Sequence, residues 1–67
     1  MIKTVLFGRA CEVDERALKM FVRKETLVKQ ATEFKAQGND AELSRVIQSI
    51  IRINRKIAAS GFHVMYQ

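Results

Sequence analysis

The chain has 67 residues, enough for one small domain, and its single cysteine, Cys11, excludes an intramolecular disulfide. Its apolar runs cover only a few residues each, which excludes a membrane-spanning helix, since such a helix needs roughly 20 apolar residues. A net charge of +5, from 12 Lys and Arg against 7 Asp and Glu, favours acidic partners such as nucleic acid or an acidic protein surface.

The short length also limits the stability of the fold. A domain of this size buries only about 60% of its unfolded surface, so it usually gains stability from a disulfide, a metal or a second copy. With one cysteine and no secretory leader pattern, we expect a soluble protein of the reducing cytoplasm. Self-association is then the remaining source of stability, and we predict a homodimer.

The first half of the chain predicts a strand followed by a long helix. Residues 2–7 are rich in β-branched and aromatic side chains, which is typical of a strand. Residues 14–37 carry apolar side chains at helical spacing, with Asp14 as the N-cap and Gly38 as the left-handed residue that ends the helix.

The second half of the chain predicts another helix and a final strand. Residues 40–59 repeat apolar side chains at a/d spacing, with Asn39 as the N-cap and Glu42 completing a capping box. Residues 62–66 alternate between two faces, as a half-buried strand does. The very short connection makes the helices antiparallel neighbours, which places both strands at the same end of the helical hairpin.

These elements predict an α+β fold in a single domain, residues 1–67, with the order β-α-α-β. An antiparallel α-hairpin carries a two-stranded antiparallel sheet formed by the first and last strands. Because a two-stranded sheet is not stable alone, it must pack on the helices or beside a second copy. Helical-wheel positions predict that the patch under the sheet consists of Leu18, Val22, Ile51 and Ala58.

The same helical-wheel argument predicts a basic face opposite the sheet. Folding the chain about Gly38 brings Arg23 level with Arg52 and Lys19 level with Lys56. The helix dipole and ordinary solvation explain cations near the end of the second helix, but the start of the first helix favours anions. The predicted binding residues of the basic face are Arg16, Lys19, Arg23, Arg45, Arg52 and Lys56.

Two polar residues, Lys24 and Asn54, interrupt the apolar seam at nearly the same level of the hairpin. A hydrogen bond between them would fix the register of the helices. Alternatively, Asn54 meets its own copy across a dimer seam, as buried Asn does in coiled coils. In the third alternative, Lys24 extends to water and Asn54 lies at the edge of the stripe. Arg55 points toward the sheet side and stands apart from the basic face.

The sequence contains no pattern that predicts an enzyme, a metal site or a cofactor. Cys11 precedes a helix N-terminus, where a thiolate can be stabilised, but no His or Asn pattern supports a nucleophile. A metal would need Cys11, His63 and carboxylates such as Glu12, without the paired ligand spacing of zinc sites. There is no glycine-rich phosphate loop. We therefore predict a non-catalytic protein with no cofactor and no metal.

We expect a small regulatory or interaction protein, an inhibitor or adaptor of the kind that phages and mobile elements encode, which binds a macromolecule through the basic face. Its helices, each about 30 Å long, offer more surface than their shared core uses. The alternative is a nucleic-acid-binding protein that contacts RNA or DNA phosphates without sequence preference. Scarce aromatic residues and a tight interhelical turn count against that alternative. A membrane surface ranks last, because the core needs the apolar faces.

Overall fold

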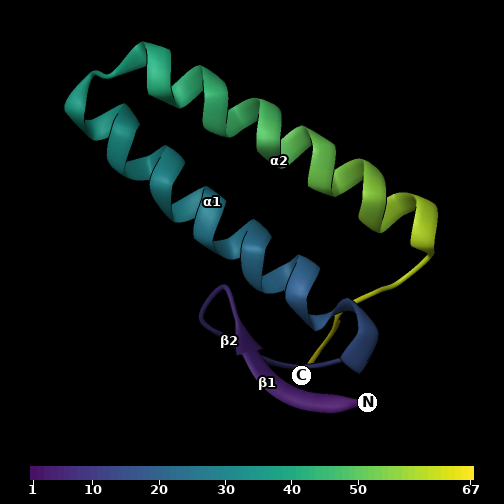
Figure 1. Cartoon of the computed structure of the whole chain (residues 1–67). Helices are drawn as coiled ribbons and strands as arrows, with labels where there is room; N and C mark the ends of the chain where they lie inside the picture. Colours follow the sequence, from purple (N-terminus) through teal and green to yellow (C-terminus); the bar gives the residue numbers. More distant parts are fainter.

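The computed structural model describes all 67 residues and contains two long helices and three strands. The elements in chain order are β1 (Ile2–Leu6), β2 (Arg9–Val13), a 3₁₀ turn (Glu15–Ala17), α1 (Leu18–Gln37), α2 (Asp40–Ser60) and β3 (Met65–Tyr66). The two helices form an antiparallel hairpin, and the sheet lies against the first half of α1 (Figure 1). The expected α+β class is confirmed.

The sheet differs from the expected one, because it has three antiparallel strands in the order β1-β2-β3. β2 is the central strand, with β1 paired along its whole length on one side and β3 on the other. The first and last strands therefore do not pair with each other, and the element order is β-β-α-α-β rather than β-α-α-β. The final strand is Met65–Tyr66, shorter than the predicted 62–66.

A two-residue turn at Phe7 and Gly8 joins β1 to β2, and it explains why sequence reasoning missed the second strand. Both residues have positive φ, 53° and 75°, as a type I′ turn in a tight hairpin requires. Asn-Gly is the usual sequence signal for such a turn, whereas a bulky residue rarely adopts positive φ. The carboxylate of Glu25 in α1 accepts a hydrogen bond from the Phe7 N–H, which ties the turn to the helix and lowers the pKa of Glu25.

Gly38 and Asn39 form the tip of the helical hairpin. Gly38 is left-handed, with φ of 70°, and its N–H donates to the Lys35 carbonyl. The Asn39 side chain caps α2 by accepting the N–H of Glu42 at 3.3 Å. The structure lacks the return bond of a complete capping box, because the Asn39 N–H donates to the Phe34 carbonyl instead.

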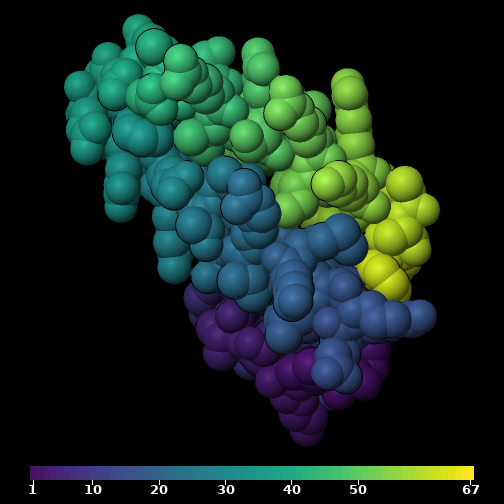
Figure 2. All heavy atoms as spheres, in the orientation of Figure 1, coloured from purple at the N-terminus to yellow at the C-terminus, as the bar shows by residue number.

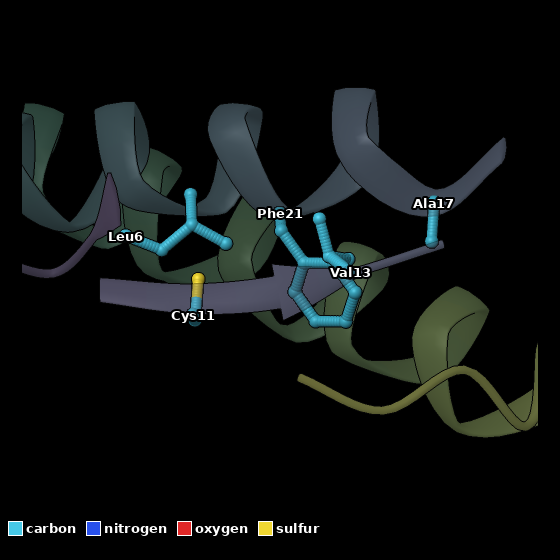
Figure 3. Close-up of a cluster of buried hydrophobic side chains, with 5 residues drawn as sticks. All are labelled: Leu6, Cys11, Val13, Ala17 and Phe21. Carbon is cyan, nitrogen blue, oxygen red and sulfur yellow. The ribbon is translucent and has the colours of Figure 1, made fainter. Parts of the chain in front are cut away.

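A first core lies between the sheet and α1. Leu6 of β1 and the alternate residues Cys11 and Val13 of β2 lie on the helix side of the sheet, and Phe21 of α1 and Ala17 of the preceding turn point back toward the strands (Figure 3). The buried members are Leu6, Cys11, Val13, Ala17 and Phe21. Ile57, Phe62 and Val64 pack against this cluster, so the end of α2 and the segment after it close the core.

A second core lies between the two helices and consists of Leu27, Val46 and Ile53. Met20 and Ile57 pack against both clusters, so the two cores are continuous. Four apolar a/d residues of α2 belong to this seam: Val46 and Ile53 are buried in it, and Ile50 and Ile57 pack against it. It holds the two helices together along the length of the hairpin.

The predicted apolar floor under the sheet is largely wrong. Leu18 packs against the sheet core, but Val22 and Ile51 are each 46% exposed, and Ala58 is exposed. Phe21, which helical spacing places at the edge of the interhelical stripe, lies under the sheet instead. The error follows from the missed strand: the sheet joins the start of α1 through β2, so it covers α1 rather than both helices.

The molecule is elongated and thin, with principal extents of 38 × 24 × 14 Å. The purple strands lie against the blue first half of α1, and the green α2 forms the opposite edge (Figure 2). α1 is therefore the middle layer, whereas α2 is covered mainly on the side that faces α1. Neither helix has an apolar stretch long enough to cross a membrane.

The placement of the sheet is tested by two identical substitutions. Val13→Ala should lower the free energy of unfolding by about 2 kcal/mol, because it opens a cavity at a residue that is 0% exposed. Val22→Ala should change it by less than about 0.5 kcal/mol, because Val22 is 46% exposed. Urea unfolding followed by circular dichroism measures both, and equal losses would contradict the observed packing.

Candidate functional site

A groove of about 330 Å³ runs between α1 and α2, and cations of both helices line it. Lys19 and Arg23 come from α1, and Arg52 and Lys56 come from α2. Residues four apart on a helix are separated by about 6 Å along its axis and share one side of it. Each helix therefore contributes two cations to the rim of this hollow, which we call the basic groove.

The floor of the basic groove is apolar. Met20 and Ile53, which belong to the core between the helices, form it, and Ser49 completes the lining. No acidic side chain lines the groove, and none of its four cations forms an ion pair. Four unbalanced positive charges therefore surround an apolar strip, an arrangement that a bound anion would stabilise.

Arg16, a predicted binding residue, does not line the groove and is already engaged. Its guanidinium pairs with the Asp14 carboxylate at 2.8 Å and lies 5.3 Å from the centre of the Phe62 ring. Asp14 also caps the 3₁₀ turn by accepting the Arg16 N–H. The hydrogen bond from the Arg16 side chain is the main reason that the pKa of Asp14 falls from 3.8 to about 2, and the same contact raises the pKa of Arg16.

Arg45, another predicted binding residue, also lies outside the groove lining. Its guanidinium pairs with Glu42 at 3.3 Å, one turn away on α2. Such exposed pairs are weak, so a stronger acidic ligand can replace the Glu42 partner. Because Arg45 precedes Ser49 by one helical turn, it extends the basic stripe of α2 toward the tip.

The structure brings Lys24 and Asn54 into no hydrogen bond with each other or with another side chain. Lys24 is half-buried and Asn54 is exposed. The intrachain hydrogen bond that would fix the helix register is therefore absent. Asn54 lies beside the interhelical seam, and its role at a dimer seam stays a prediction.

Cys11 and His63 do not combine into a chemical site. Cys11 is 1% exposed and belongs to the core between the sheet and α1. His63 is exposed in the segment before β3. No group of three or more His, Cys, Asp and Glu side chains is placed to hold a metal ion. Cys11 is thus a packing residue.

Sequence reasoning missed a second hollow, of about 360 Å³, on the opposite side of the hairpin. Thr32, one of its lining residues, is about 180° from Arg23 on the helical wheel. Most of the lining is apolar, so we call this hollow the apolar groove. Its lining residues are Val28, Ala31, Thr32, Lys35, Leu43, Ile47 and Ile50. Of its α2 residues, Leu43 and Ile50 belong to the interhelical stripe, so the sequence signal for this hollow is Ile47, an apolar residue beside that stripe.

Comparison with protein-family models, with curated proteins and with solved structures finds no significant match. Function is therefore inferred from the physical character of the two grooves. The basic groove has four cations and an apolar floor, whereas the apolar groove has the exposed Ile47, the half-buried Ile50 and a single lysine.

Asp14→Asn should make the stability of the fold less sensitive to acid. Folding lowers the pKa of Asp14 from 3.8 to about 2, so its stabilising effect is present above pH 3.8 and is lost as the pH falls to about 2. Asn keeps an acceptor for the cap but does not titrate. Unfolding followed by circular dichroism across that range measures the slope, with Glu15→Gln as the control. Identical acid sensitivity of Asp14→Asn and the unmodified chain would contradict the assignment.

Proposed function

We propose that the protein is a small non-catalytic interaction protein, of the inhibitor or adaptor type, that holds an acidic segment of another protein in the basic groove. The observation that supports this most directly is the set of four unpaired cations from two helices over an apolar floor. We include the predicted homodimer in this proposal, with an interface that leaves the basic groove open.

The spacing of the groove suits an acidic amphipathic helix. Glu or Asp residues at positions i and i+4 of such a helix are about 6 Å apart, as are Lys19 and Arg23 on α1 and Arg52 and Lys56 on α2. An apolar residue between the carboxylates would contact Met20 on the floor. A third helix in this position packs against two others at about 8–10 Å, as in ordinary helical bundles.

Nucleic acid is the second candidate, and the lining of the groove favours it less. Phosphates would pair with the four cations, but no aromatic side chain lines the groove to stack on a base. Phe21 and Phe34 belong to or pack against the two cores, and the Tyr66 ring is occupied by Arg9 at 4.7 Å. A phosphate backbone also has no apolar side chain that could pack against the floor of the groove.

A peptide display library selected against the immobilised protein tests this function. We expect the enriched peptides to carry Asp or Glu at helical spacing with an apolar residue between them. Arg23→Glu/Arg52→Glu should weaken their binding at least about tenfold, because one cation on each rim becomes repulsive. Fluorescence anisotropy measures the dissociation constants.

The matched control is Lys3→Glu/Lys35→Glu, which changes the net charge equally but leaves the basic groove intact. This control should bind the selected peptides within about twofold of the unmodified protein. If both double variants lost the same affinity for the peptides, net charge alone would explain the loss, and the proposed site would be contradicted. Tighter binding of a single-stranded RNA or a DNA duplex, lost in Arg23→Glu/Arg52→Glu, would favour the nucleic-acid function instead.

A further inference from the structure

Helix α2 carries two stripes with the same a/d spacing, and only one of them has a partner. The inner stripe packs toward α1 and consists of Leu43, Val46, Ile50, Ile53 and Ile57. A second stripe, displaced by one residue along the chain, consists of Ser44, Ile47, Ile51, Asn54 and Ala58. We call this second stripe the outer seam. Apolar residues repeated at this spacing are typical of helices that pack against another helix, and Ile47, Ile51 and Ala58 are the apolar members of the outer seam.

The outer seam is uncovered in the single chain. Ile47 and Ile51 are 44% and 46% exposed, and the other three members are exposed as well. Ile47 also lines the apolar groove, which continues the apolar surface onto Val28 of α1. Two central isoleucines flanked by small or polar side chains thus form a strip that faces solvent along α2.

The whole chain exposes more surface than its mass predicts. A folded monomer of 7.7 kDa exposes about 4,300 Å² by the usual scaling, whereas this chain exposes 4939 Å², an excess of about 600 Å². A standard interface covers about 800 Å² on each partner. Only 8 of the 67 residues are buried, so the chain lacks the interior that other domains use for stability. One helix-to-helix contact would remove most of this excess.

We propose that the outer seam packs antiparallel against the outer seam of a second copy of the chain. With a twofold axis level with Ser49, Ile47 of one copy packs against Ile51 of the other, and these two contacts form the apolar centre. The same register places Ser44 opposite Asn54 of the second copy. Asn54 therefore gains a hydrogen-bonding partner that it lacks within its own chain.

The charges beside the outer seam favour a second copy of the chain as its partner, and they favour the antiparallel orientation. Asp40 at the start of α2 then lies within one helical turn of Arg55 of the second copy, and neither residue has an ion-pair partner in its own chain. A parallel pair would instead place Asp40 beside Asp40. The dipoles of the two α2 helices also oppose each other favourably only in the antiparallel pair.

The interface lies on the side of the hairpin that carries the apolar groove, so it does not require the basic groove or its ligand. Both basic grooves remain open, and the dimer presents two of them. A partner with two acidic segments would then bind with higher avidity than one segment alone. Self-association is measured without any ligand, so its failure is distinguishable from failure of the basic groove to bind an acidic peptide.

Sedimentation equilibrium from roughly 1 µM to 1 mM tests the dimer. The unmodified chain should dimerise with a dissociation constant in the micromolar range, as expected for an interface of modest size. Ile51→Glu should raise that constant at least about 100-fold, because it places a charge in the apolar centre. Val22→Glu is the control, since Val22 is also 46% exposed but lies on α1. A monomeric unmodified chain, or equal effects of the two variants, would overturn the proposal.

Cysteine cross-linking tests the orientation without disturbing the core. Chains with Ser44→Cys are mixed with chains with Asn54→Cys in an oxidising glutathione buffer. The antiparallel register predicts a mixed disulfide between the two variants, with a yield above that of either variant alone. The unmodified chain is the control, because Cys11 is 1% exposed. Preferential cross-linking of Asn54→Cys to itself would overturn the antiparallel arrangement.

Discussion

The structure depends on α1, because this helix packs against α2 with one face and against the sheet with another. Phe21 and Ala17 fill the sheet core, while Leu27 fills the core between the helices. Because α1 is the middle layer, one core lies on each of two of its faces. Ile57, near the end of α2, packs against both cores. α2 lacks a second neighbour of its own, and its uncovered sides are those that carry the basic rim and the outer seam.

Sequence periodicity was sufficient to predict the helical hairpin but not the three-stranded sheet. Helix spacing and the Gly38-Asn39 tip are local signals, so they predict the two helices and their antiparallel contact. The β1–β2 turn has no such signal, because Phe7 adopts a positive φ that Asn or Gly usually provides. The Glu25 carboxylate, 18 positions away along the chain, accepts a hydrogen bond from the Phe7 N–H, and local sequence patterns do not predict a contact of that range.

The basic groove could be predicted in part for the same reason. Lys19, Arg23, Arg52 and Lys56 converge because helical geometry and the tip fix their positions. Arg16 and Arg45 do not line the groove, and each pairs with a nearby carboxylate, Asp14 or Glu42, which wheel positions alone do not predict. The apolar floor of the groove depends on which seam residues border the hollow, and only the packed structure shows that Met20 and Ile53 do.

The two sides of the hairpin thus differ in chemistry: one is basic with an apolar floor, and the other is apolar with a polar Ser44 and Asn54 at its flanks. The most direct test of this division of roles is nuclear magnetic resonance of the ¹⁵N-labelled protein, titrated with a selected acidic peptide. We predict shift changes at Lys19, Arg23, Arg52 and Lys56, and little change at Ile47 and Ile51. Shift changes centred on the outer seam or on the sheet, with none along the basic groove, would contradict the account.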